Sequence, residues 1–166
     1  MIDISSLSNE YEVRRLDDSN VDEVLTLCQG NTLFYQYCQA EPTREQILDD
    51  MHIAPPGKDD SDKYYVGFYR DERLVAVMDL LDGYPEDNIA FIGFFMMDAF
   101  LSRQGIGTKI IFEVADYLKT HGFTTIRLAI DKDNPQSNHF WDKNGFSVIE
   151  EVDRDGWPVL VAENNL

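Results

Sequence analysis

The run of residues 89–97, IAFIGFFMM, carries no charge and is apolar on both faces that a strand would present. A strand of this kind must be covered on both sides, so the run predicts a central strand of a sheet. The apolar residues that follow it share one stripe at helical spacing: Ile106, Ile110, Val114 and Leu118. Residues 124–130, TTIRLAI, then alternate as a strand does. Strand, helix and strand in this order predict a right-handed crossover and a parallel strand pair.

The other segments add antiparallel strands and further helices to this unit. Apolar and polar or aromatic residues in strand-like runs predict strands at 11–16, 63–70 and 74–81, and a closing hairpin made of 146–152 and 157–162. Caps and spacing predict helices at 21–29, after Thr43 and at 135–143. The expected fold is α/β (α+β), a mixed and mostly antiparallel sheet of about seven strands flanked by about four helices. At 166 residues we expect a single domain, 1–166.

Charge and the lack of long apolar runs exclude several classes of function. The chain has 31 acidic and 14 basic residues, a net charge of −17, which disfavours binding to nucleic acid and to anionic membranes. No run approaches the ~18 apolar residues of a membrane helix, and the first residues, MIDISSLSNEYEV, do not read as a secretory leader. We therefore expect a cytoplasmic protein with no nucleic acid and no membrane as partner.

The chain has two cysteines, Cys28 and Cys38. Their spacing matches neither a CxxC redox pair nor a zinc site, which needs four ligands. We expect two reduced thiols and no bound metal.

The segment that joins the central strand to the following helix is SRQGIGTKI, residues 102–110. A helix N-terminus presents unpaired N–H groups and about half a positive charge, so it can bind an anion. Gly105 and Gly107 would let those amides approach a phosphate, and Thr108 adds a hydroxyl donor. The dinucleotide pattern GxGxxG fails at Ile110, and the phosphate-loop pattern fails because the lysine follows Thr108. A plain structural turn is the alternative interpretation.

Two stretches, FFMMDAFLSRQGIGTKII and NPQSNHFWDKNGF, together resemble the GNAT superfamily of N-acetyltransferases. In that family the pattern Q/R-x-x-G-x-G/A binds the pyrophosphate of acetyl-CoA, and a pattern like N-x-x-A-x-x-x-Y-x-K-x-G-F lies downstream. The positions of this chain that match are Gly105 and Gly107 in the first pattern, and Asn134, Lys143, Gly145 and Phe146 in the second. The resemblance covers about residues 64–151, with the coenzyme-binding motifs within 89–146, and it agrees with the order of elements predicted above.

The resemblance implies direct transfer of the acetyl group of acetyl-CoA to a primary amine, without an acyl-enzyme. The pantetheine arm would pair with the strand that carries Phe95, Met96 and Met97, and the backbone amide of Met97 would donate to the thioester oxygen. The coenzyme-binding residues that the resemblance implies are Phe95, Met96, Met97, Arg103, Gln104, Gly105, Ile106, Gly107, Thr108, Asn134, Ser137 and Phe140.

The chain departs from the family pattern at several positions. Ser102 stands at the Q/R position and Arg103 follows it where a small residue is usual, while Ser137 replaces the alanine. Trp141 stands where the family has the tyrosine that is taken to protonate the leaving thiolate, and an indole N–H cannot act as an acid near pH 7. Because a thiol has a pKa near 8.5, expelling the unprotonated thiolate costs only about 2 kcal/mol. Activity can therefore survive this departure.

The acceptor amine must lose a proton before it attacks, because an alkyl ammonium has a pKa of about 10. Asp79 is our candidate base, since it lies on the same alternating face as Val75 and Val77, where desolvation would raise the pKa of a carboxyl group. A solvent-facing acid at a strand end is the alternative interpretation. Glu86 and Asp98 are weaker candidates.

The sequence thus predicts an acetyl-CoA-dependent N-acetyltransferase that releases coenzyme A and acts on a small-molecule or peptide amine. Tyr35 and Tyr37 either line the acceptor site or belong to the core. A GNAT-type module that binds acyl-CoA but has lost catalysis is the alternative function, and a nucleotide-binding oxidoreductase is a third. Members of the family often form homodimers through their C-terminal strands, and the resemblance allows the same assembly here.

Overall fold

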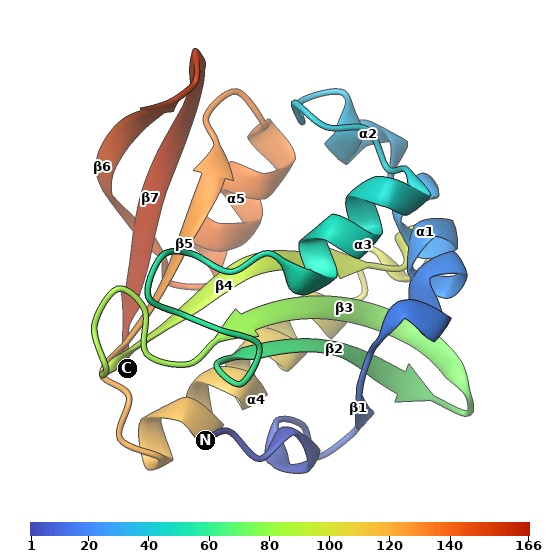
Figure 1. Ribbon diagram of the computed structural model, residues 1–166, viewed down its shortest axis with the longest axis horizontal. Coiled ribbons are helices and arrows are strands. Elements are labelled where there is room, and N and C mark those ends of the chain that lie inside the picture. Colours follow the sequence, from blue (N-terminus) through green and yellow to red (C-terminus); the bar gives the residue numbers. More distant parts are fainter.

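The computed structural model describes residues 1–166 and contains one seven-stranded sheet (Figure 1). The strands lie in the order β1-β2-β3-β4-β5-β7-β6. Their bounds are β1 Glu12–Arg15, β2 Lys63–Arg70, β3 Arg73–Leu81, β4 Ile89–Met97, β5 Thr125–Asp131, β6 Ser147–Arg154 and β7 Trp157–Asn165. The helices are α1 Val21–Gln29, α2 Thr32–Tyr35, α3 Arg44–His52, α4 Ile106–Thr120 and α5 Pro135–Lys143.

The sheet is mixed and mostly antiparallel, as predicted. Only β4 and β5 pair in parallel, and α4 is the crossover between them. The closing hairpin joins the sheet through its second strand, because β7 lies between β5 and β6. This leaves β1 and β6 as the two edges of the sheet.

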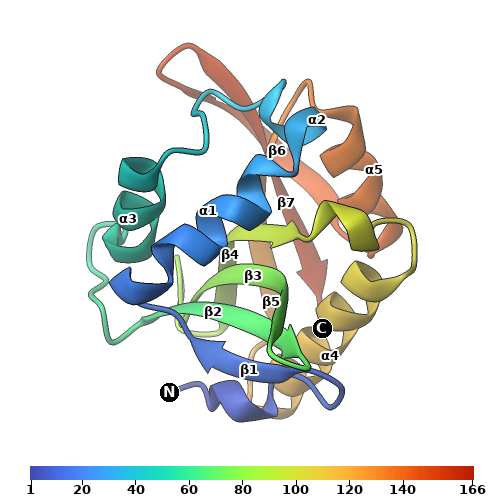
Figure 2. The ribbon, with the colours of Figure 1, turned by 90° about the vertical axis from the view of Figure 1, so that its right-hand side faces the viewer.

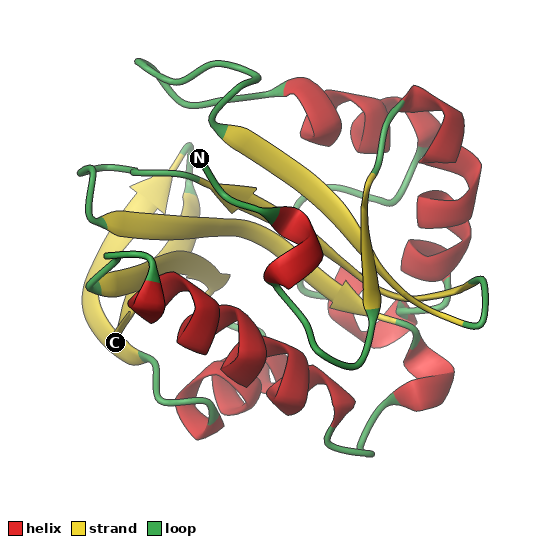
Figure 3. Cartoon of the chain, turned by 90° about the horizontal axis from the view of Figure 1, so that it is seen from below, coloured by secondary structure: helices red, strands yellow, loops and turns green.

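Helices cover both faces of the sheet (Figures 2 and 3). On one face α4 and α5 contribute Ile110 and Trp141 to a core cluster that includes Ile92 of β4. On the other face α1 and α3 pack against β3 and β4, for example through Ile47 against a cluster that contains Val77. The central strands are therefore buried from both sides, which explains why residues 89–97 carry no charge.

Side-chain caps fix the first residues of two helices, α3 and α5. The Thr43 hydroxyl accepts a hydrogen bond from the Gln46 N–H and so caps α3, while the Asn134 side chain caps α5 in front of Pro135. Both helices begin where the sequence predicts. None of the helices is long and apolar enough to cross a membrane.

The structure differs from the sequence prediction in two details. A short fifth helix, α2, follows α1 where no helix is predicted, because four residues are too few to show a period. Val75 joins the core cluster on the α4 face, whereas Val77 joins the cluster on the α1 face. The reason is a bulge in β3, where Phe68 pairs with Ala76 and the next residue of β2 pairs with Leu74.

Candidate active site

Strands β4 and β5 begin as a parallel pair and then separate. Residues 89–92 pair with residues 125–128, but β4 continues to Met97 and β5 to Asp131 without further pairing to each other. A bulge of β4 against β3, with Gly93 as its extra residue, accompanies the separation. Gly93 is exposed although it lies in a central strand. Residues 93–97 of β4 therefore have no partner strand on the side that faces β5, although β4 lies in the middle of the sheet. We call this side of residues 93–97 the unpaired edge of β4.

The Met97 N–H lies on this unpaired edge. The next residue, Asp98, donates its N–H to the Val75 carbonyl of β3 at 2.8 Å. Backbone groups alternate between the two edges of a strand, so both the N–H and the C=O of Met97 point away from β3. The side-chain amide of Asn31 donates to the Met97 carbonyl at 2.8 Å, in agreement with this orientation. Because the pairing with β5 ends at residue 92, the sheet provides no acceptor for the Met97 N–H.

The N-terminus of α4 follows this edge in the chain and carries no side-chain cap. Its N-cap residue, Gly105, has a φ of 76°, in the left-handed region that glycine adopts without a Cβ penalty. The N–H groups of the first turn, which comprises Ile106, Gly107 and Thr108, therefore have no competing side-chain acceptor. This arrangement is typical of an anion-binding helix terminus.

The two cations of this segment have different surroundings. Lys109 forms an ion pair with Glu10, so its charge is compensated within the protein. Arg103 forms no ion pair and lies in the loop before α4 with a φ of 63°. Of the two cations, Arg103 is the one that is available to an anion.

Gly107 has a packing role that differs from the one indicated by the sequence. It is buried, and a Cβ at this position would lie 2.7 Å from the Met97 Sδ and 3.2 Å from the Phe140 ring. The missing side chain thus lets α4 approach β4 and α5 closely. A Cβ on Gly105 would meet no atom within 4 Å, so the reason for glycine there is the left-handed backbone.

Aromatic rings connect the unpaired edge of β4 to α5. Phe95 stacks on Phe140 with ring centroids 5.9 Å apart, and Trp141 lies 6.0 Å from Phe95 and 5.0 Å from Phe146. Trp141 is 8% exposed and belongs to the core cluster on the α4 face. The structure therefore gives Trp141 the packing role of a core residue.

Asn134 is fully buried and uses only part of its side chain. Its Oδ1 accepts a hydrogen bond from the Ser137 N–H at 3.1 Å, whereas its Nδ2 has no partner in the protein. A buried donor without an acceptor costs stability, so it indicates a missing partner. Ser137 and Phe140 lie on the first turns of the same helix, which brings these three predicted residues together.

Asp79 is buried, as predicted, and forms an ion pair that the sequence analysis did not foresee. Lys63 Nζ lies 2.6 Å from Asp79 Oδ2, and the two residues are 3% and 7% exposed. Burial raises the pKa of Asp79 to about 6, while the Lys63 ammonium opposes this rise. Asp79 Oδ1 has no hydrogen-bond partner. Above pH 6 the group is thus a buried carboxylate with one free oxygen.

The bulge places Asp79 directly beside the exposed part of β4. A Cβ on Gly93 would lie 2.6 Å from Asp79 Oδ2, so only a glycine leaves room for the carboxylate. Met97 lies three residues beyond Phe94, the partner of Asp79 in the sheet, which is about 10 Å along the strand. The structure therefore brings Asp79 to the unpaired edge but not into contact with Met97.

Other titratable groups gather on the same face as Asp79. Burial raises the pKa of Tyr65 on β2, whose hydroxyl has no partner, and the pKa of Asp50 on α3. Burial also raises the pKa of Cys28 to about 11, so this thiol is neutral. Asp98, a weaker candidate for the base, is bound to Arg73 at 2.6 Å and accepts from the Phe100 N–H.

Comparison with known proteins assigns the family. A model of the acetyltransferase (GNAT) family matches residues 26–146, which is most of the chain. The chain belongs to the acetyltransferase (GNAT) family. No curated protein sequence is a significant match to it.

Solved structures of acetyltransferases share the fold at low sequence identity. PaiA N-acetyltransferase from Thermoplasma acidophilum, in complex with coenzyme A, has a TM-score of 0.68 and 18% identity over 94% of this chain and 99% of its own. An acetyltransferase from Thermus thermophilus has a TM-score of 0.74 and 16% identity, over 94% and 97%. An alanine N-acetyltransferase of a ribosomal protein from Escherichia coli has a TM-score of 0.65 and 13% identity, over 93% and 93%.

Tyr35, one of the two predicted acceptor residues of this GNAT protein, packs on the face of the sheet opposite α4. Tyr35 is half-buried against the core cluster on the α1 face, and its ring meets Phe34 edge-on at 5.0 Å. Phe34 in turn meets Phe94 of β4 at 6.5 Å. Tyr37 is half-buried and forms no aromatic contact. Tyr35 is thus part of an aromatic group that borders the unpaired edge of β4.

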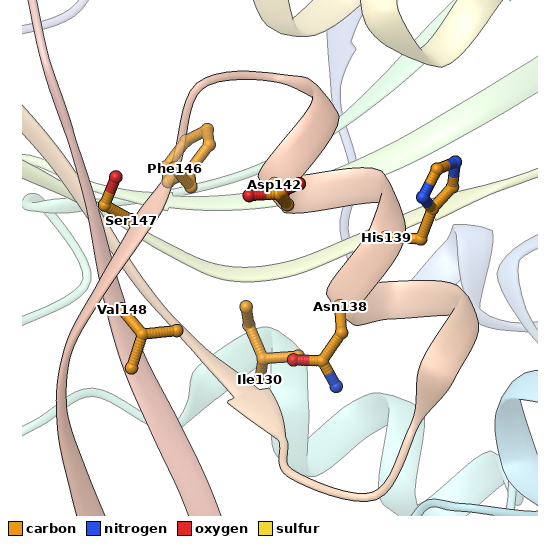
Figure 4. Close-up of a pocket in the computed structure, with 7 residues that line it drawn as sticks. All are labelled: Ile130, Asn138, His139, Asp142, Phe146, Ser147 and Val148. Carbon is orange, nitrogen blue, oxygen red and sulfur yellow. The ribbon is translucent and has the colours of Figure 1, made fainter.

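A hollow of about 500 Å³ lies elsewhere on the GNAT domain, between α5 and β6 (Figure 4). Its lining consists of Ile130, Asn138, His139, Asp142, Phe146, Ser147 and Val148. None of the predicted coenzyme-binding residues lies in it, and the His139 ring points away from Ile130 and Val148 (Figure 4). This hollow therefore shares no lining residue with the predicted coenzyme site, and it adjoins the candidate active site through Phe146, whose ring meets Trp141.

Two residues of the site were missed by the sequence analysis, Lys63 and Asn31. Lys63 begins a strand whose next six residues are all apolar or aromatic, and an ammonium group at the start of such a run is the signal in the sequence that indicates a buried partner. Asn31 stands in an ordinary turn after α1, where nothing in the sequence indicates a contact with β4.

Proposed function

We propose that this GNAT protein transfers the acetyl group of acetyl-CoA to a primary amine. The observation that carries the proposal is the unpaired edge of β4 beside the uncapped N-terminus of α4. Acetyl-CoA, when bound, supplies an activated acyl group as a thioester. The amine acceptor is a small molecule or a peptide.

The residues present fit coenzyme A. The first-turn amides of α4 and the unpaired Arg103 side chain suit a pyrophosphate. The N–H groups of Phe95 and Met97 suit the amides of a pantetheine arm, because both point to the edge that β5 has left.

In this proposal the Met97 N–H stabilises the negative charge that develops on the acyl oxygen. A fixed backbone donor of this kind contributes about 3 kcal/mol to transition-state stabilisation. Such a donor must be preorganised, and a strand held by β3 on its other edge provides that rigidity.

Asp79 is the proposed base. It is ionised above pH 6, its Oδ2, which Lys63 binds, lies behind the exposed Gly93, and its Oδ1 is buried without a hydrogen-bond partner. Because Met97 is about 10 Å away along the strand, Asp79 would receive the proton of the amine through water.

A second candidate function is an acyl-CoA-binding module without catalysis. The burial of Trp141 at the family's tyrosine position favours it, because no acidic hydroxyl takes the place of that tyrosine. Turnover decides between the two functions. Release of free thiol from acetyl-CoA with at least one amine of a panel of polyamines, amino sugars and peptides supports the enzyme. Tight coenzyme binding with no thiol release supports the module.

Coenzyme binding itself is expected to stabilise the fold. At a concentration of 100 Kd, acetyl-CoA should add about 2.7 kcal/mol to the free energy of unfolding, because it binds only the folded state. Differential scanning fluorimetry measures the rise in Tm. NAD at the same concentration should leave Tm unchanged, and a rise with NAD alone would support a nucleotide-binding oxidoreductase instead.

Replacement of Trp141 by Phe is expected to leave kcat within about twofold of the wild-type value. The indole N–H is not an acid near pH 7, so its loss removes no proton donor. The smaller ring should cost about 1 kcal/mol or more of stability, because Trp141 packs between Phe95 and Phe146. Steady-state kinetics and a urea titration measure the two effects. A loss of kcat above tenfold in a folded variant would assign Trp141 a role in catalysis.

A further inference from the structure

Asn31 connects the segment after α1 to the end of β4. Its side-chain Nδ2 donates to the Leu27 carbonyl of α1 at 2.9 Å and to the Met97 carbonyl of β4 at 2.8 Å. Asn31 and Met97 are far apart in the sequence, so this is a tertiary contact. Figure 2 shows α1 lying across the sheet, with α2 following it. The contact therefore fixes the α1–α2 segment to the residue whose N–H lies on the unpaired edge.

The usual role of an asparagine at this position does not explain the contact. Asn31 is the N-cap residue of α2, where an asparagine oxygen normally accepts from the N–H groups of the first turn. Here the side chain forms no cap hydrogen bond, and its NH₂ group binds two carbonyl oxygens instead. The Asn31 side chain therefore holds the end of β4 and does not cap α2.

The contact constrains the Met97 backbone from the side that β3 cannot reach. β3 holds the peptide plane after Met97 through the Asp98 N–H, which donates to the Val75 carbonyl. Asn31 holds the other end of the same plane through the Met97 carbonyl. With both ends held, the peptide plane after Met97 has little freedom to rotate, and this restricts the neighbouring plane that carries the Met97 N–H.

We propose that Asn31 is a positioning residue that aims the Met97 N–H for acetyl transfer. The inference rests on the proposed function, in which this N–H stabilises the acyl oxygen. Asn31 itself does not touch the acyl group in this proposal. It acts only through Met97, so its loss should change the rate of the chemical step and leave coenzyme binding intact.

The most informative substitution to test this proposal is Asn31→Asp. Aspartate has the same shape, and α2 loses no capping hydrogen bond in this variant because the Asn31 side chain forms none. A carboxylate has no N–H to donate, and it would face two carbonyl oxygens. We expect kcat to fall about 10- to 100-fold, since a displacement of about 1 Å in an active site has effects of this size. The KM for acetyl-CoA and the Kd for coenzyme A should stay within about threefold.

Asn31→Ala is the second variant, and Asn88→Ala is its matched control. Asn88 precedes β4 at the opposite end of the strand, and its side chain likewise makes one tertiary hydrogen bond, to Thr124 Oγ1 at 2.7 Å. Asn88→Ala should keep kcat within about twofold. If both Asn31 variants keep wild-type kcat, or if kcat falls equally in Asn88→Ala, the positioning role is wrong.

A second readout does not depend on turnover. Protein labelled with [¹⁵N]methionine gives few amide cross-peaks, because the chain has five methionines. The Met97 peak is identified by its absence in Met97→Leu. In Asn31→Asp this peak should shift more than the other methionine peaks. An unshifted Met97 peak overturns the inference, even if the wild-type protein acetylates no amine. A shifted peak in a protein whose wild type is inactive supports the positioning role of Asn31 and refutes the proposed function.

Discussion

Replacement of Asp79 by Asn is expected to lower kcat/KM by about a hundredfold. General-base catalysis contributes about 10²- to 10⁴-fold, and an amide cannot take up the proton of the acceptor amine. Steady-state kinetics in which the acceptor concentration is varied at saturating acetyl-CoA measure the loss. The control is Asp50→Asn, because Asp50 is a half-buried acid whose pKa burial also raises on the same face, but it lies on α3 and not beside the strand edge. This control should retain activity within about threefold.

The pH dependence gives an independent test of Asp79. Burial raises its pKa to about 6, and a base works only when it is deprotonated. The ionisation of Asp79 should therefore not change the rate above pH 6, and below pH 6 its protonation should lower the rate tenfold per pH unit. In Asp79→Asn this acidic limb should be absent. An unchanged acidic limb in the variant would assign the proton transfer to another group.

Stability must be separated from catalysis in this experiment. Asp79→Asn leaves the Lys63 ammonium buried without its carboxylate, and breaking one half of a buried pair costs about 3–5 kcal/mol. The double variant Asp79→Asn with Lys63→Met removes both charges and should recover most of that loss. If the double variant is stable and still impaired, the loss of activity belongs to Asp79 and not to unfolding.

Replacement of Gly107 by Val is expected to abolish detectable coenzyme binding and to lower stability by about 1–3 kcal/mol. The new side chain would collide with Met97 and Phe140, because even a Cβ lies 2.7 Å from the Met97 Sδ. Both neighbours belong to the proposed coenzyme site, so their displacement should weaken binding at least a hundredfold. Isothermal titration calorimetry with coenzyme A and a thermal melt measure the two effects.

Gly30→Ala is the control for this substitution. A Cβ at Gly30 meets its nearest atom at 3.4 Å, an ordinary contact, and its φ of −69° suits alanine. Coenzyme affinity should therefore be unchanged within about twofold. Wild-type affinity in a folded Gly107→Val protein would show that coenzyme A binds elsewhere, and the hollow between α5 and β6 would then be the next site to test.

Much of the fold could be predicted from the sequence because its signals are local. The helices α1 and α5 begin and end at the predicted residues, since caps and apolar spacing act within one or two turns. The uncharged run of β4 indicated a central strand, and the apolar stripe of α4 indicated a crossover. The helix α2 and the bulge in β3 were missed because neither is long enough for an apolar pattern to repeat.

The sequence by itself determined the family, the parallel β4–α4–β5 unit and the glycine turn that precedes α4, because the signal for each lies in contiguous residues. Only the tertiary structure decided that Lys63 pairs with Asp79, that Gly107 makes room for Met97, and that Asn31 holds the Met97 carbonyl. These contacts join residues from separate elements. Their geometry depends on how the sheet bulges and where β5 leaves β4, and neither property is visible in the order of the amino acids.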